Sequence, residues 1–461
     1  MLFVLIGTSF KRFFSEDRDQ WLIMAEALKV GVAGLGTVGT SVVRALCEKA
    51  NSLACQCGRF IKVVAVSARD KNRNRGIDLS DIKWFDSPVE LAASDEIDVF
   101  VELVGGELDV VYTAVKRALE AGHHVVTANK ALLARHGVEL AIIAEKKGVF
   151  LHFEAAVAGG IPVIKAMRES LVSNHISRIY GILNGTCNYI LTRMFTEGLS
   201  FKDCLADAQR LGYAEADPSF DIEGNDTAHK LALLTSLAFG TAVSLDDVYV
   251  EGIHNISQID IRAADELGYR IKLLGVALKT DSGIEQRVHP TMVPISSMIA
   301  QINGVTNALS IQSDLLGELL FSGPGAGGMA TASAVIGDLA DIAKARSGFQ
   351  YAPVLRRPAL ELTPHKKARI SHHAGGYFIR LNVHDRTGVF AAVARHMADN
   401  HISLESIVQR SFVEDQIEKT IILITHETTE VNVRQALAEI EKDGHLVAKS
   451  QFIRIEPMAE N

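Results

Sequence analysis

The stretch "LKVGVAGLGTVGTSVVRALCEKA", residues 28–50, decides the fold of the N-terminal half of the chain. A short apolar strand runs into Gly34, Gly36 and Gly39, and a helical pattern of apolar residues follows directly. In this context glycines allow a tight turn, close backbone approach to a pyrophosphate and close packing of helix on strand. A glycine-rich turn without a ligand is the alternative. The strand-loop-helix placement favours a dinucleotide-binding motif.

Further strands alternate with helices up to about residue 150. "FIKVVAVSARD" (60–70), "IDVFVELVGG" (97–106) and "HHVVTANK" (123–130) are apolar strands, and helical "LDVVYTAVKRALEAG" lies between the last two. The alternation predicts a parallel, doubly wound α/β sheet over residues 24–150, with ligands bound beyond the carboxyl ends of its strands. That edge is where we expect Lys130, although a solvated lysine at a helix start fits equally well.

The cofactor preference depends on the residue after the second strand. An acid that binds the ribose is expected there, but the chain has Arg69, and a basic group favours NADP over NAD. Lys71, Arg73 and Arg75 follow, but such a run is more typical of a solvated face. We therefore expect Arg69 alone to act, with NAD still possible as cofactor.

Composition limits the class of protein. The chain has 461 residues, 48% of them apolar and 22% charged, with a net charge of -8 and no basic stripe, which argues against nucleic-acid binding. The apolar run within residues 1–23 is too short to span a bilayer, so no membrane association is expected. We predict that this segment is an appendage outside the fold. Five unevenly spaced cysteines fit reduced thiols in the cytoplasm.

The stretch "LGYAEADPSFDIEGNDTAHKLALL", residues 211–234, places five carboxylates within twelve residues, just before Lys230. Helical spacing puts Asp226 and Lys230 one turn apart on one face. A surface ion pair is the alternative, but the preceding segment is an irregular loop that gathers acids beside a lysine. A lysine ammonium can donate a proton to a developing alkoxide, and surrounding acids can bind a cationic amine. The stretch predicts reduction of a carbonyl group on an amino-acid substrate.

A second loop could bind a cation. "LHFEAAVAGGIPVIKAM", residues 151–167, passes from a strand into a loop of small residues and carries Glu154 at its edge. One carboxylate with backbone carbonyls suits a hard cation. A packing loop in which Glu154 caps the next helix is the alternative.

Five blocks in order resemble the homoserine dehydrogenase family: "GVAGLGTVG", "ANKALLA", "GILNGTCNYIL", "LGYAEADPSFDIEGNDTAHKLA" and "GPGAGGMATASAV". The resemblance covers residues 28 to about 345. It implies an N-terminal Rossmann domain, followed by an α+β catalytic and dimerisation domain over residues 151–348. It also implies reduction of L-aspartate 4-semialdehyde to L-homoserine with NAD(P)H, in the biosynthesis of threonine, methionine and isoleucine, by a homodimer or homotetramer.

The resemblance also assigns residues. It makes Lys230 the proton donor, Lys130 a second active-site lysine that touches cofactor and substrate, and Glu215 and Asp226 substrate contacts supported by Asp221. The cofactor site combines Gly34, Gly36, Thr37, Val38, Gly39 and Arg69 with Lys130, Gly212 and Gly327. The loop at Glu154 resembles a sodium site, with Glu154 and the backbone oxygens of Val157, Gly159 and Ile161 as ligands.

The tail reads as a separate module. "YAPVLRRPALELTPHKKARI" (351–370) has three prolines and little periodicity, which predicts a linker over residues 349–375. Residues 376–457 follow a ferredoxin-like βαββαβ pattern, in which Val389, Val393 and Met397, and Val433, Leu437 and Ile440, turn two helices toward the sheet.

The tail's "VHDRTGVFAAVARHMADNHISLESI" resembles an ACT domain, a module that often binds amino acids. The expected ligand is L-threonine, acting as a feedback inhibitor. A purely structural dimerisation module is the alternative. If the tail binds threonine, cutting the chain near Pro364 is expected to leave an active core that threonine does not inhibit.

Two other functions are alternatives to homoserine dehydrogenase activity. An aldehyde dehydrogenase would use a thiolate, for which Cys187 in "NGTCNY" is the candidate, but no base stands beside it in sequence. A nucleotide-sensing binding protein would bind NADPH without consuming it, and would leave the acids and Lys230 without a chemical role.

Overall fold

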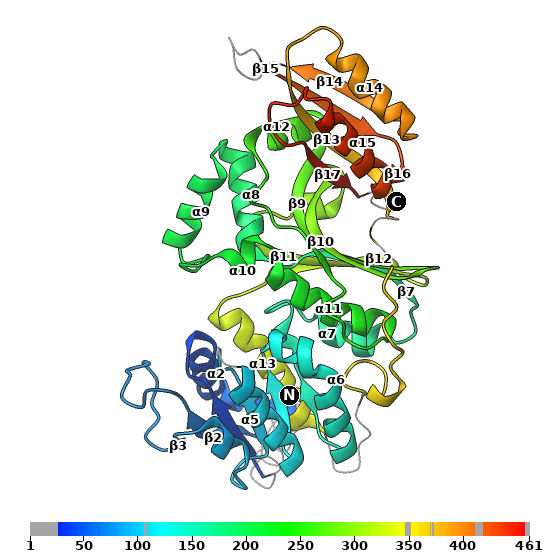
Figure 1. Cartoon of the computed structure of the whole chain (residues 1–461). Helices are drawn as coiled ribbons and strands as arrows, with labels where there is room; N and C mark the ends of the chain where they lie inside the picture. The colour runs from blue at the N-terminus through cyan, green and yellow to red at the C-terminus, as the bar shows by residue number, and fades with distance from the viewer. Residues whose placement is uncertain are drawn as a thin grey trace, which may run out of the picture. The chain divides into compact units, whose positions relative to one another are not determined.

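The computed structural model describes residues 26–105, 108–345, 352–368, 370, 373–410 and 418–456. Its described residues form two compact units. Unit 1 takes its residues from Met1–Ser173, Gly240–Val243 and Pro324–Thr363. Unit 2 takes its residues from Asn174–Phe239, Ser244–Gly323 and Pro364–Asn461. Figure 1 shows the course of the chain from blue at the N-terminus to red at the C-terminus.

Unit 1 contains a six-stranded sheet in the order β3-β2-β1-β4-β5-β6, and each neighbouring pair is parallel. Its strands are β1 (Leu28–Ala33), β2 (Ile61–Ser67), β3 (Lys83–Phe85), β4 (Val99–Glu102), β5 (His124–Thr127) and β6 (Leu151–His152). Every residue of β4 is buried, as expected for a parallel strand covered on both faces. The predicted doubly wound parallel sheet is confirmed.

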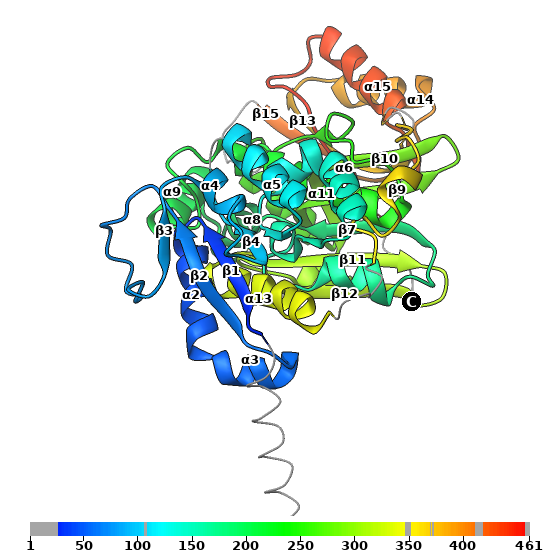
Figure 2. The same cartoon turned by 90° about the horizontal axis from the view of Figure 1, so that it is seen from below.

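Helices from two regions of the chain cover this sheet. They are α2 (Thr37–Glu48), α3 (Ala50–Cys57), α4 (Pro88–Ala92), α5 (Leu108–Ala121), α6 (Lys130–Lys147) and α13 (Gly328–Lys344), with short turns at η1 (Glu154–Ala156), α7 (Val163–Lys165), η2 (Ala166–Ser170) and η4 (Ala359–Glu361). Figure 2 shows α13 beside the sheet together with α2 and α3. The approach is close, since a Cβ on Gly328 would lie 2.7 Å from Ser41 Oγ. Residues 324–345, placed by sequence in the catalytic domain, thus belong to unit 1.

Unit 2 is built on one long mixed sheet in the order β12-β11-β7-β9-β10-β17-β13-β15-β14, with β8 beside β10 and β16 beside β13. Its first part contains β7 (Ile176–Ile182), β8 (Tyr249–Val250), β9 (Tyr269–Thr280), β10 (Gly283–Pro294), β11 (Thr306–Ser313) and β12 (Gly317–Pro324). The helical segments there are α8 (Gly185–Glu197), α9 (Phe201–Arg210), α10 (Ser219–Ile222), α11 (Asn225–Phe239), α12 (Gln258–Glu266) and η3 (Met298–Gln301). Helix α11 packs on β7, β9 and β10.

The last part of unit 2 has the predicted βαββαβ order. It consists of β13 (Ala374–His384), α14 (Val389–Asp399), β14 (Leu404–Arg410), β15 (Glu418–Thr425), the short β16 (Thr428–Thr429), α15 (Glu430–Lys442) and β17 (Gln451–Ile455). The six apolar helix residues predicted to face the sheet all lie in one buried core with Tyr377, Ile379 and Leu381 of β13. The ferredoxin-like module is therefore confirmed.

This module is joined to the rest of unit 2 by strand pairing. Strand β17 runs parallel to β10, with Thr291 opposite Arg454 and Met292 opposite Ile455. The segment before the module is also packed. In unit 1, Ala359 N donates to Glu145 Oε2 at 2.8 Å, and in unit 2, Lys367 forms an isolated parallel β-bridge with Ile284. Residues 352–368, part of the linker predicted over 349–375, therefore lie against the folded units.

Candidate functional site

The glycine loop after β1 has the geometry that a dinucleotide needs. Gly34 has φ +93°, and a Cβ there would lie 2.3 Å from Leu103 O. Gly36 is the N-cap of α2, and a Cβ built on it meets no atom within 4 Å. Thr37 and Val38 then open the helix, whose N-terminal N–H groups favour an anion. The open space at Gly36 fits a pyrophosphate at the start of α2.

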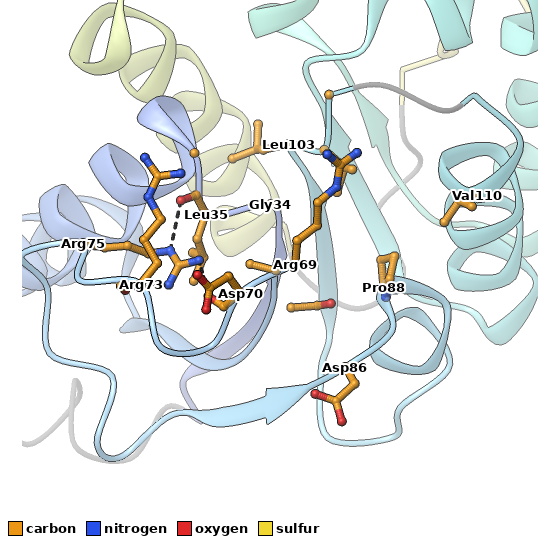
Figure 3. Close-up of a pocket in the computed structure, with 15 residues that line it drawn as sticks. Gly34, Leu35, Arg69, Asp70, Arg73, Arg75, Asp86, Pro88, Leu103 and Val110 are labelled. Carbon is orange, nitrogen blue, oxygen red and sulfur yellow. Dashed lines mark hydrogen bonds between the residues drawn. The ribbon is translucent and has the colours of Figure 1, made fainter.

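A pocket of about 360 Å³ adjoins this loop (Figure 3). Its lining includes Gly34, Leu35 and Gly36 from the loop, Ser67 to Asp70 from the end of β2, and Leu103 to Gly105 beyond β4. Arg69 lines it as predicted, but so do Arg73 and Arg75. Figure 3 shows the Arg69 side chain on one side of the pocket and those of Arg73 and Arg75 on the other. With three arginines in its lining, the pocket suits a phosphate-bearing ligand.

Arg75 ties two loops of this pocket together. Its Nε donates to Leu35 O at 3.2 Å, Nη1 to Arg73 O at 2.9 Å and Nη2 to Asp70 O at 2.6 Å. Figure 3 shows the bond to Leu35 as a dashed line. These three acceptors take three of the five N–H groups of Arg75 and hold its side chain against the loops, so Arg69 and Arg73 are the better candidates for a ligand phosphate.

A buried acid that the sequence reasoning missed holds the other edge of the pocket. Glu102 is 1% exposed and accepts the N–H of Val104 at 2.7 Å and the hydroxyl of Thr127 at 2.5 Å. Burial raises the pKa of Glu102 to about 7. Thr127 Oγ1 in turn accepts the N–H of Asn129, the N-cap of α6, and so fixes the position of Lys130 at the first turn. An acid at the end of an apolar strand was the available signal.

In unit 2, four side chains come together, and we call them the acid–lysine cluster: Asn184, Asp221, Asp226 and Lys230. Lys230 Nζ donates to Asp226 Oδ2 and to Leu183 O, each at 2.7 Å. Both side chains are mostly buried, with 12% of Lys230 and 8% of Asp226 exposed. The predicted pairing on one face of a helix is present, and its burial distinguishes it from a surface ion pair.

Asn184 joins the two acids of the cluster. Its Nδ2 donates to Asp221 Oδ1 at 2.8 Å and to Asp226 Oδ2 at 2.9 Å. Asn184 was not among the residues selected from the sequence. It is also the N-cap of α8, since its Oδ1 accepts the N–H of Cys187 at 2.8 Å.

Three more predicted site residues are exposed: Gly212 and Glu215 in unit 2, and Gly327 in unit 1. Glu215 is exposed, and its backbone carbonyl accepts a bond from Gln209 at 3.1 Å. Gly212 has φ +76°, and a Cβ there meets no atom within 4 Å. Gly327, in unit 1, has φ +116° and is the N-cap of α13, again with open space at its Cβ position. Both glycines are open enough for a ligand to approach the backbone.

Cys187 does not have the environment of a catalytic thiolate. Its side chain is fully buried, and Sγ contacts Asp221 O at 3.2 Å. Burial, together with the negative charges of Asp221 and Asp226, raises the pKa of Cys187 well above its ordinary value. An uncharged thiol of this kind argues against the thiolate mechanism of the rival aldehyde dehydrogenase.

The carboxylate of Glu154 caps the next helix, which was the alternative to a cation ligand. Its two oxygens accept the N–H groups of Ile164 and Lys165, each at 2.8 Å. Burial raises the pKa of Glu154. Among the predicted backbone ligands, Ile161 O accepts the N–H of Val163 at 2.9 Å. A cation is compatible with this loop only through the remaining lone pairs of these oxygens.

A neighbouring group in unit 1 has metal-ligand composition, but its surroundings are cationic. Ligand atoms of His152, Asp338 and Asp341 lie within 4.8 Å of one another. Lys165 Nζ lies 2.5 Å from Asp341 Oδ2, and Arg168 Nη2 lies 3.4 Å from His152 Nε2. Because an arginine can only donate, His152 Nε2 accepts, and the proton of the neutral ring is on Nδ1, the nitrogen that lies 3.8 Å from Asp338 Oδ1. We assign this group to loop packing.

Comparisons with known proteins agree with this geometry. The family model for homoserine dehydrogenase matches residues 162–340, the model for the NAD-binding domain of homoserine dehydrogenase matches residues 34–154, and the ACT domain model matches residues 377–445. The chain is 45% identical to a homoserine dehydrogenase of Pseudomonas aeruginosa over 436 residues, which cover 94% of this chain and 99% of that one.

Solved structures give the same result. The crystal structure of a homoserine dehydrogenase from Thiobacillus denitrificans matches with a TM-score of 0.88 and 42% identity, over 94% of this chain and 98% of that one. A hyperthermophilic archaeal homoserine dehydrogenase in complex with NADPH matches with a TM-score of 0.59 and 27% identity, over 68% of this chain and 97% of that one.

Proposed function

Because this chain belongs to the homoserine dehydrogenase family of NAD(P)-dependent oxidoreductases that act on CH–OH groups, we propose that it reduces L-aspartate 4-semialdehyde to L-homoserine with NADPH. The observation that carries the proposal is the buried pair of Lys230 and Asp226, with Nζ 2.7 Å from Oδ2. The archaeal relative bound to NADPH and the arginines of the pocket support NADPH as the preferred donor.

The cluster supplies the proton for this reaction. Bound NADPH would supply the hydride to the aldehyde carbon. Among the described residues, Leu183 O and Asp226 Oδ2 take two of the three ammonium hydrogens of Lys230 and leave one for the aldehyde oxygen. As that oxygen gains charge, the ammonium stabilises it and then transfers the proton, so that the aldehyde becomes an alcohol. Asp221 and Glu215 are the proposed partners of the substrate ammonium, and Lys130 the proposed second active-site lysine.

A substrate comparison tests the proposed function. The full-length protein should oxidise NADPH rapidly with L-aspartate 4-semialdehyde, and only slowly with an aldehyde of the same length that lacks the α-amino group. The reason is that the acids near Lys230 offer an ion pair only to a cationic substrate. If the protein binds NADPH but oxidises it with no amino-acid semialdehyde, the result would instead favour a nucleotide-sensing binding protein.

We expect Arg69→Ala to weaken NADPH binding by about 10- to 100-fold, the equivalent of one strong charge-assisted hydrogen bond, and to leave NADH within about twofold. Only NADPH carries the 2′-phosphate that Arg69 can bind. Dissociation constants of both cofactors, measured by fluorescence, check this. Arg73→Ala is the matched comparison, because Arg73 lines the same pocket. An unchanged preference in Arg69→Ala with a lost preference in Arg73→Ala would move the phosphate contact to Arg73.

Threonine is the proposed feedback inhibitor, bound by the ACT domain. The attachment of β17 to β10 supports coupling of this module to the catalytic sheet. A coupling free energy of about 1–3 kcal/mol corresponds to a change of about 5- to 150-fold in affinity. L-Threonine should therefore inhibit NADPH oxidation by the full-length enzyme, and D-threonine should not. Unchanged activity at threonine concentrations far above the substrate would leave the module as an assembly element.

Three further features belong to the same proposal. A sodium ion would bind at Glu154 with the carbonyls of Val157, Gly159 and Ile161, and thermal stability compared in sodium and choline salts tests that.

The enzyme would act as a homodimer or homotetramer in the cytoplasm, in the pathway to threonine, methionine and isoleucine. In the described part of the chain, no helix combines the length and the apolar character that a membrane span requires.

A further inference from the structure

Asn184 lies at the point where the acid–lysine cluster is held together. It is 5% exposed and stands between β7 and α8, next to Leu183, whose carbonyl accepts from Lys230. Asn307 Nδ2 donates to the same carbonyl at 3.0 Å, which fixes Leu183 from β11. Residues 183 and 184 thus form one rigid platform that contacts both ends of the Lys230–Asp226 pair.

The orientation of the Asn184 amide is determined by its partners. Cys187 N–H is a donor, so the atom facing it at 2.8 Å must be Oδ1. The Nδ2 group must then face the acids, and its two hydrogens match its two acceptors, Asp221 and Asp226. Two carboxylates that accept from one nitrogen repel each other, and a neutral double donor holds them close without neutralising either.

We propose that Asn184 is a positioning residue: its amide fixes the carboxylate of Asp226, and through it the ammonium of Lys230, in the orientation for proton transfer to the substrate. This inference rests on the proposed function and assigns to Asn184 a role beyond capping α8. The titratable groups that face the amide are Asp221 from α10, Asp226 and Lys230 from α11, and Cys187 from α8 itself.

Two substitutions separate this role from capping. Aspartate and serine cap helices about as well as asparagine, so Asn184→Asp and Asn184→Ser both keep a bond to the N–H of Cys187. Neither can donate to Asp221 and Asp226 together. Asn184→Asp adds a third carboxylate, while Asn184→Ser adds no charge and is therefore its matched control.

The test measures kcat/KM for L-aspartate 4-semialdehyde over a range of pH, alongside NADPH affinity and thermal unfolding. At neutral pH both variants should lose about 100-fold in kcat/KM, the scale of a misplaced reacting group. In Asn184→Asp the neighbouring acids raise the pKa of the introduced carboxyl. Its protonated form is neutral and can donate one bond, so activity relative to wild type should recover as pH falls. In Asn184→Ser that ratio should stay constant.

Wild-type kcat/KM in either variant, or a ratio independent of pH in Asn184→Asp, would reduce Asn184 to a helix cap. Failure of the wild-type enzyme to turn over the semialdehyde would instead overturn the proposed function, so the two failures are distinguishable. If Asn184→Asp does not fold, the kcat/KM of Asn184→Ser with intact NADPH affinity still decides between the two roles.

Discussion

Lys230→Ala is expected to lower turnover by about 10²- to 10⁴-fold, the usual contribution of a positioned general acid, while NADPH binds almost as in the wild type. In the proposed mechanism the lysine acts on the oxygen that gains charge in the transition state, whereas the glycine loop and arginines proposed to bind the cofactor belong to unit 1. Single-turnover oxidation of NADPH with L-aspartate 4-semialdehyde, together with NADPH affinity, measures both quantities.

Two further variants sharpen this prediction. Lys230→Arg keeps the positive charge but cannot release its proton, so it should be nearly as inactive as the alanine variant. Lys202→Ala removes an exposed lysine of α9 and should have no effect. Near-native turnover in Lys230→Ala would remove Lys230 from the chemistry, and near-native turnover in Lys230→Arg would mean that charge alone is required.

Arg454→Met is expected to destabilise unit 2 by about 3–5 kcal/mol, the cost of removing one partner from a buried ion pair. Arg454 of β17 is fully buried. Its Nε lies 2.7 Å from Glu430 Oε2, and its Nη1 lies 2.8 Å from Glu251 Oε2. Glu430 begins α15 of the ACT domain, whereas Glu251 follows β8 of the catalytic sheet, so this arginine joins the two parts of the unit.

Unfolding in urea measures the loss as a lower midpoint of the transition of unit 2. Arg395→Met is the matched control. Arg395 is 82% exposed and lies 3.7 Å from Asp399 on α14, and such a surface pair contributes only about 0–1 kcal/mol. Equal midpoints for the two variants would show that the ion pairs of Arg454 with Glu251 and Glu430 do not hold the ACT domain to the catalytic sheet.

The same charges change the expectation for a shortened chain. Buried Arg287 and half-buried Arg178 are both paired with Glu456 at the end of the module. Cutting near Pro364 would remove Glu456 from Arg287 and Arg178, and Arg454 from Glu251, and the loss is costly above all at buried Arg287. We therefore expect the shortened protein to be poorly stable, and not the autonomous, threonine-insensitive core that the proline-bearing segment suggests in the sequence.

Local patterns predicted the elements whose causes are local. Gly34, Gly36 and Gly39 after an apolar strand were sufficient for the dinucleotide-binding unit, because strand, turn and helix are contiguous. The spacing of Asp226 and Lys230 likewise predicted one shared helix face. The βαββαβ module followed from its alternating periods.

The features that sequence did not predict depend on contacts between distant segments. Helix α13 returns to the N-terminal sheet about 290 residues after α2 begins. Strands β10 and β17 pair although they are far apart in sequence, so no hairpin turn between them predicts the pairing. Asn184 and Glu102 were missed for a related reason. Each is a common polar residue at the end of a strand, and its importance depends on acceptors or donors that only the folded chain brings to it.

Transfer of deuterium from cofactor to product tests whether the enzyme reduces L-aspartate 4-semialdehyde with NADPH. NADPH carrying deuterium at C4 of its nicotinamide ring, with each stereoisomer used separately, is incubated with the enzyme and L-aspartate 4-semialdehyde, and the product is examined by mass spectrometry and NMR. We expect one stereoisomer to yield homoserine with a single deuterium on its hydroxymethyl carbon, and Lys230→Ala to yield almost none. Oxidation of NADPH without deuterated homoserine from either stereoisomer would contradict this expectation.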